Sequence, residues 1–105
     1  MSKFNDTIYA LSTPTGKSAI ALIRVSGNQS LKILKTISSI KKIKPKKATL
    51  TFLKIKKTTI DQVIITYFKK PNSFTGEEMI EINCHGSIAI INKISQILKK
   101  LGARL

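Results

Sequence analysis

The sequence predicts an α+β domain in which two helices pack on a mixed, mainly antiparallel β-sheet of about five strands. Three observations support this class. β-Branched and apolar residues form several short runs, two segments carry apolar residues at helical spacing, and the predicted order is strand, strand, helix, three strands, helix. With 105 residues, 42% of them hydrophobic, the chain is long enough to bury one two-layered core. The sequence therefore predicts a single domain over residues 1–105.

The first two strands are predicted near the N-terminus. Residues 7–13, TIYALST, form a β-branched and aromatic run, and we expect a turn at Pro14 and Gly16. Residues 18–27, SAIALIRVSG, follow as a second strand that closes at Gly27.

Two segments are predicted to be helices. Residues 28–40 begin at Asn28, which we expect to be the N-cap, and residues 87–102 end with two lysines and then Gly102 as the C-cap. The β-branched start of the second segment leaves an extended first turn as an alternative. The apolar residues at helical spacing are Leu31, Leu34 and Ile37 in the first segment and Ile91, Ile94, Leu98 and Leu101 in the second.

Three further strands are predicted between the helices. They are residues 48–56, ATLTFLKIK, residues 61–68, DQVIITYF, and residues 79–84, MIEINC. The second is nearly continuous in apolar residues, so we expect it to be central in its sheet. The chain ends with ARL, which looks like the beginning of another element and leads us to expect a fragment of a longer protein.

The net charge of +14 has two interpretations. It predicts a surface for nucleic acid or another anion, or it reflects compositional drift in which lysine and isoleucine are abundant throughout. The densest cluster, KKIKPKK at residues 41–47, contains a proline and no aromatic residue, and is expected to be a solvated loop.

The remaining composition excludes several classes of protein. A single cysteine excludes an internal disulfide framework and a cysteine-rich zinc site. No apolar run is long enough for a signal peptide or a membrane span, so we expect a cytoplasmic protein with no membrane association. Gly16, Lys17 and Ser18 match the end of a phosphate-binding P-loop, but Leu11 stands where that motif needs glycine and a strand follows instead of a helix. This chain alone is therefore not expected to hydrolyse GTP or ATP.

Arg24 and Glu81 are the polar residues that strand alternation singles out. Arg24 shares one side of its strand with Ile20 and Leu22, and Glu81 lies inside an apolar strand. An unpaired charge on either side chain would lower the stability of the folded protein. Either the two form a structural ion pair or lie on a solvated sheet face, or both face a pocket for a small polar heterocycle. In that pocket the carboxylate would accept two parallel hydrogen bonds from a pterin-like edge.

The stretch PNSFTGEEMIEINCHG, residues 71–86, combines three of the five carboxylates with the only cysteine and the only histidine. Cys84 and His85 are adjacent strand residues that point in opposite directions, so no catalytic dyad and no metal site is expected there. The turn that carries Phe74 is longer than a hairpin needs, and long shaped loops beside a sheet usually bind something.

This stretch and DTIYALSTPTGKSAIALIRVSG, residues 6–27, closely resemble the N-terminal domain of the MnmE family of tRNA-modification GTPases, also called TrmE. The resemblance covers essentially the whole chain. It implies a domain that binds 5-formyltetrahydrofolate, forms the homodimer of the full protein and has a fold similar to the folate-binding domains of glycine-cleavage T-proteins. Full-length members act with the flavoprotein MnmG (GidA) on the wobble uridine of certain tRNAs.

The resemblance also implies which residues meet the folate. Arg24 and Glu81 occupy the positions that contact it, and the pocket wall would be formed by Phe74, Thr75, Gly76, Asn83 and His85. Glu77 and Glu78 would be peripheral. The alternative is a basic RNA-binding module that binds no folate.

Some expected parts of the family are changed or missing. Lys17, Ser18 and Ser87 depart from the family pattern. A further Pro-Gly-Glu-Phe segment and a lysine that complete the family's folate site are not in this sequence. The helical and GTPase domains are absent as well, so GTP, magnesium and potassium are expected to concern only the G domain of full-length members.

Overall fold

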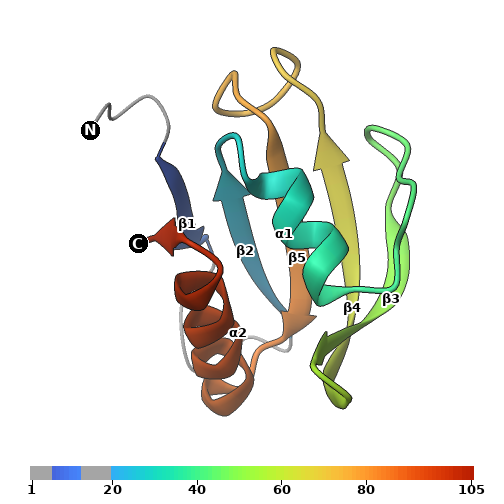
Figure 1. Cartoon of the computed structure of the whole chain (residues 1–105), viewed down its shortest axis with the longest axis vertical. Coiled ribbons are helices and arrows are strands. Elements are labelled where there is room, and N and C mark those ends of the chain that lie inside the picture. Colours follow the sequence, from blue (N-terminus) through green and yellow to red (C-terminus); the bar gives the residue numbers. More distant parts are fainter. Residues whose placement is uncertain (1–5, 13–19) are drawn as a thin grey trace.

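The computed structural model describes residues 6–12 and 20–105. It contains a six-stranded sheet and two helices (Figure 1), which confirms the α+β class. The predicted turn at Pro14 and Gly16, and the Gly16-Lys17-Ser18 motif, lie outside the described residues. The elements are β1 (Thr7–Leu11), β2 (Ile20–Ser26), α1 (Ser30–Ile37), β3 (Thr49–Ile55), β4 (Thr58–Phe68), β5 (Met79–His85), α2 (Ile88–Lys100) and β6 (Ala103–Arg104).

The strands are arranged in the order β3-β4-β5-β2-β1-β6. All neighbouring strands are antiparallel except β1 and β6, which are parallel. The sixth strand, β6, is formed by two residues of the ARL segment, where the sequence analysis expected another element to begin, and it adds to the five predicted strands. β4 lies between β3 and β5, as expected, but its residues alternate between buried and exposed instead of being buried on both faces.

Both helices cover the same face of the sheet. Buried side chains of α1 (Ile33, Leu34) and α2 (Ile94, Leu98) join one core cluster with the inward residues of the strands, among them Ile82. Cross-strand partners share a face, so the residues between those inward positions point to the opposite side. The sheet therefore has one covered face and one face that carries no helix, which we call the open face.

The helix caps differ from the sequence-based expectation. The N-cap of α1 is Gln29, not Asn28, and its side chain makes no capping hydrogen bond. The Gln29 backbone N–H instead donates to Thr7 Oγ1 at 3.0 Å, which ties the helix start to β1. α2 is helical from Ile88, so its first turn is not extended, and Leu101 is its C-cap, with Gly102 following at a φ of +98°. None of the helices in the described residues is long and apolar enough to cross a membrane.

Candidate functional site

Arg24 and Glu81 face each other across β2 and β5 on the open face of the sheet. They are direct cross-strand partners, and Arg24 Nε donates to Glu81 Oε2 at 2.8 Å. The side chains are 31% and 18% exposed, so the pair is accessible without being fully solvated. Neither the two terminal guanidinium nitrogens nor Glu81 Oε1 bonds to another described residue. The structure therefore contains the ion pair, and within the described residues these atoms make no other hydrogen bond.

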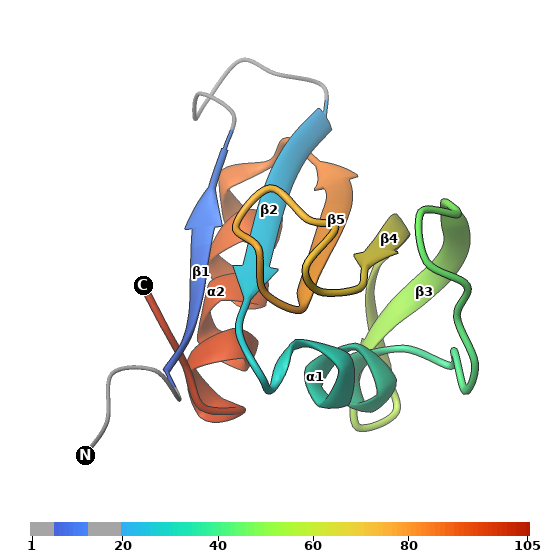
Figure 2. The ribbon, with the colours of Figure 1, turned by 90° about the horizontal axis from the view of Figure 1, so that it is seen from above.

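Phe74 packs on the guanidinium of Arg24. The Arg24 Cζ atom lies 4.6 Å from the centroid of the phenyl ring, within the range of a cation–π contact. The ring is 78% exposed. It comes from the turn between β4 and β5, which crosses the ends of β2 and β5 when the molecule is seen from above (Figure 2). This turn brings an aromatic side chain to the charged pair.

The turn is fastened to β2 by side-chain hydrogen bonds. Ser26, at the end of β2, is hydrogen-bonded to Thr75 Oγ1 at 2.6 Å and donates to Glu77 Oε1 at 3.1 Å. Ser73 Oγ donates to the Glu77 carbonyl at 2.6 Å, and Gly76 takes a φ of +79°. Glu77, expected to be peripheral, thus helps to hold the turn in shape.

Glu78 fastens the same turn to β4. Its Oε1 accepts a hydrogen bond from the Tyr67 hydroxyl at 2.5 Å and another from the Lys70 backbone N–H at 3.3 Å. Burial, together with the hydrogen bond to Glu78 and the negative charge of that carboxylate, raises the pKa of Tyr67 to about 12. Tyr67 therefore stays a neutral donor, and Glu78 has a structural role.

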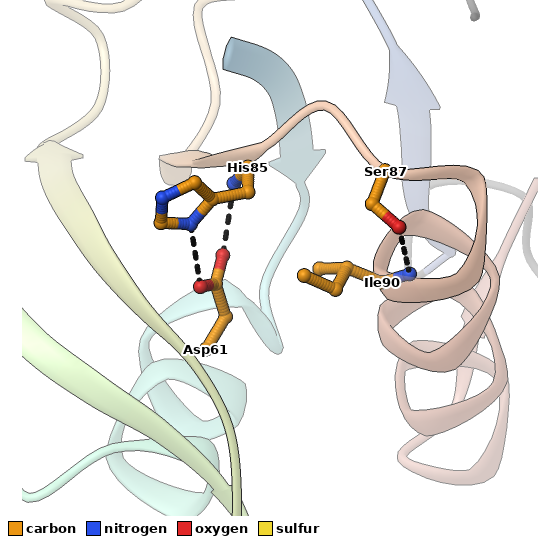
Figure 3. Close-up of polar contacts among 4 residues, drawn as sticks. All are labelled: Asp61, His85, Ser87 and Ile90. Carbon is orange, nitrogen blue, oxygen red and sulfur yellow. Dashed lines mark hydrogen bonds and ion pairs between the residues drawn. The ribbon is translucent and has the colours of Figure 1, made fainter. Parts of the chain in front are cut away.

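Asp61 and His85 form a second polar pair, which the sequence analysis did not predict (Figure 3). Asp61 Oδ2 accepts from the His85 backbone N–H at 2.8 Å, and Asp61 Oδ1 lies 2.6 Å from His85 Nδ1. The Asp61 side chain is 7% exposed and that of His85 is 66% exposed. The carboxylate therefore orients an accessible imidazole whose Nε2 is left available. Figure 3 also shows Ser87 Oγ, which accepts from the Ile90 N–H at the start of α2.

A shallow cavity of about 230 Å³ lies on the open face beside His85. Asn83 and His85 line it together with apolar residues that include Ile20 and Ile64. Of the residues expected in a pocket wall, these two therefore meet at one hollow. Phe74, Thr75 and Gly76 lie at the turn instead, and neither Arg24 nor Glu81 lines any of the three cavities found among the described residues.

Cys84 is also among the residues that line this cavity, but it lies on the covered side of its strand. Its side chain is 3% exposed and belongs to the core cluster. Burial first, and then the negative charge of Asp61, raise the pKa of Cys84 to about 11, which keeps the thiol neutral. Within residues 6–12 and 20–105, no group of three histidine, cysteine or carboxylate side chains is placed to hold a metal ion.

Comparison with known proteins agrees with the family resemblance stated from the sequence. The family described as "GTP-binding protein TrmE N-terminus" matches residues 7–105. The chain is 47% identical to a tRNA modification GTPase MnmE from Fervidobacterium nodosum, over 95% of this chain and 23% of that protein. It is 51% identical to the protein of that name from Wolbachia pipientis subsp. Culex pipiens, over 96% of this chain and 23% of the relative. It is 43% identical to the protein of that name from Helicobacter pylori (strain Shi470), over 96% of this chain and 22% of the relative.

Proposed function

The chain belongs to the TrmE N-terminal family, and from this premise we propose that it is the tetrahydrofolate-binding and homodimerisation domain of a tRNA-modifying GTPase. The chain spans 23% of the length of these curated relatives, and in this proposal the GTPase activity of the complete enzyme resides outside the segment that they share with it. In this proposal the complete enzyme acts in the cytoplasm with the flavoprotein MnmG. It converts the wobble uridine of tRNA to a nucleoside of the 5-carboxymethylaminomethyluridine type.

The observation that supports folate binding best is the accessible Arg24–Glu81 pair beneath Phe74. The Glu81 carboxylate can accept two parallel hydrogen bonds from the ring N–H and amino group of a pterin, one on Oε1 and one on the second lone pair of Oε2, and the Arg24 terminal nitrogens can donate to a carbonyl or carboxylate of the same ligand. The phenyl ring is a flat apolar surface of the kind on which a heterocycle packs. Asn83, two residues from Glu81 on the same face, leads to the cavity beside His85 and extends the polar surface.

The experiment that tests this proposal is calorimetric titration with 5-formyltetrahydrofolate. The protein is a chimera in which residues 6–105, which include the matched residues 7–105, replace the corresponding segment of the Fervidobacterium nodosum relative. We expect binding, and we expect Glu81→Gln to weaken it by at least about tenfold, or about 1.4 kcal/mol. The amide places a donor where the carboxylate accepts.

The matched control is Asp6→Asn. Asp6 pairs with Arg104 at 2.9 Å, so this variant makes the same chemical change in an ion pair of another part of the sheet. It is expected to bind folate normally. Because the Arg24–Glu81 pair is partly exposed, Glu81→Gln should lower the free energy of unfolding by less than about 1 kcal/mol. A chimera that binds no folate, or a Glu81→Gln variant that binds as well as the parent, would refute the proposal.

Homodimerisation is supported by the open face. Five large apolar side chains that are at least two-fifths exposed lie there, on four different strands. Exposed apolar surface of this extent is typical of an interface. We assign it to a second copy of the chain. The side chains and their exposed fractions are Ile8 (41%), Ile20 (60%), Leu50 (63%), Phe52 (49%) and Ile64 (40%).

A further inference from the structure

The lysines of the described residues have no acidic partners. The chain has 19 basic and five acidic residues, and every carboxylate already interacts with another group. No lysine in residues 6–12 and 20–105 takes part in an ion pair. The positive charge is therefore not neutralised within this part of the protein. The carboxylates and their partners are Asp6 with Arg104, Asp61 with His85, Glu77 with Ser26, Glu78 with Tyr67 and Glu81 with Arg24.

Five of these lysines are brought together at the end of β4. The loop before β3 is held there by a parallel bridge between Pro45 and Tyr67, and the Lys46 N–H donates to the Tyr67 carbonyl at 2.7 Å. Figure 1 shows this green loop rising beside the tip of β4. All five side chains are exposed. We call this group the lysine edge, and it consists of Lys44, Lys46, Lys47, Lys69 and Lys70.

The shape of the lysine edge restricts what it can bind. None of its lysines lines any of the three cavities found among the described residues, so it offers no groove for an acidic peptide. The two isoleucines of the loop, Ile40 and Ile43, pack against the core and are not available to enter a lipid layer. What remains is an exposed surface with several positive charges that no described carboxylate neutralises. Such a surface fits a ligand that presents a row of negative charges on its outside, as a nucleic-acid backbone does.

We propose that the lysine edge binds the phosphate backbone of RNA. This inference rests on the proposed function only for the identity of the RNA, which is then the tRNA that the enzyme modifies. Lys69 and Lys70 open the same β4–β5 turn that carries Phe74, but the lysine edge and the proposed folate site use different residues of that turn, and the other lysines lie in the loop before β3. The domain would thus bind the folate and the tRNA through different residues.

The test is tRNA binding by this chain, measured by fluorescence anisotropy over a series of salt concentrations without folate. The variant replaces Lys44, Lys47, Lys69 and Lys70 by glutamine, and leaves Lys46 unchanged because its φ is +65°. Each phosphate contact contributes about one to the slope of log affinity against log salt. We expect the slope to fall by about three to four and the low-salt affinity to fall at least about tenfold.

A matched control replaces four other exposed lysines by glutamine, namely Lys32, Lys57, Lys93 and Lys99. It removes the same total charge from the helices and the β3–β4 turn, so a loss clearly smaller than that of the lysine-edge variant supports the proposal. Equal losses in the two variants would overturn it, and so would a parent chain that binds anionic phospholipid vesicles but not tRNA. Circular dichroism checks that both variants are folded. Glu81→Gln should leave tRNA binding unchanged, so a failure of the folate proposal is distinguishable from a failure of this one.

Discussion

Cys84 is a thiol that must stay neutral in the folded protein. Its side chain is 3% exposed, and burial together with the nearby Asp61 raises its pKa to about 11 from an ordinary value of 9.0. The folded state therefore keeps the proton at pH values where the unfolded chain has lost it. By linkage, this group's contribution to stability is fully present below about pH 9 and is lost as the pH rises to about 11.

We accordingly expect the free energy of unfolding to fall more steeply between about pH 9 and pH 11 in the parent chain than in Cys84→Ala. Urea denaturation at several pH values measures both slopes. The lysines and Tyr67, which also titrate at high pH, are common to the two proteins, so their effect cancels in the difference. Parallel pH profiles would show that the pKa of the thiol is no higher in the folded state than in the unfolded one.

Strand alternation predicted part of the candidate site and missed the rest for a physical reason. It placed Arg24 and Glu81 as unusual polar residues in apolar strands, and the structure makes them cross-strand partners. The alternation of one strand does not give its register with another, so the distance between the two was not predictable. The Asp61–His85 pair was missed because it joins residues 24 positions apart through strand pairing. Its signal was an aspartate at the start of an otherwise apolar run.

The connection from β2 to α1 depends on close contact between backbones. Gly27 has a φ of +136°, and a Cβ atom there would lie 2.6 Å from both Thr7 Cα and Thr7 Oγ1. The Gly27 N–H donates to the Glu78 carbonyl at 2.8 Å, and its own carbonyl accepts from the Ser30 N–H at 3.1 Å. A glycine here allows β1, the start of α1 and the turn before β5 to meet.

Gly27→Ala is expected to destabilise the domain by more than about 2 kcal/mol, because the new methyl group collides with backbone and the positive φ is strained. Urea denaturation measures the change. Gly76→Ala is the control, since its φ is +79° but nothing lies within 4 Å of the added Cβ. That variant should lose only about 1 kcal/mol from backbone strain. If both variants lose the same free energy, the contact with Thr7 has no influence on stability.

At the scale of elements, periodicity gave the order and type of the longer segments but not their ends. The predicted helix over 28–40 is shorter in the structure because Ser38 Oγ donates to the Leu34 carbonyl and accepts from the Ile40 N–H, which ends α1 at Ile37. β4 starts at Thr58, before the apolar run, because it pairs with β3 through a tight turn. These ends depend on side-chain bonds and pairing partners that no local pattern contains.

The whole molecule has two faces of different character. The helices cover one face of the sheet, and the other carries exposed apolar side chains and the Arg24–Glu81 pair. The sequence did not show which face of the sheet the helices cover, because isoleucine and leucine occur on both sides of several strands and the alternation of apolar and polar residues is weak. If a second copy covers the open face, the proposed folate site lies at or near the junction of two chains.

The dimer proposal predicts that polar substitutions on the open face produce a monomer. Leu50→Thr combined with Phe52→Thr keeps residues that favour strands and removes two side chains that are 63% and 49% exposed. We expect sedimentation equilibrium to give a dimer for the parent chain and a monomer for this variant, with little change in the free energy of unfolding per chain at low concentration, because exposed residues contribute little to the core. Ile88→Thr is the control, since Ile88 is 59% exposed at the start of α2 and not on the sheet. A parent chain that stays monomeric at high concentration, or a dimer lost in the control and kept in the sheet variant, would refute the assignment of the open face to a second copy.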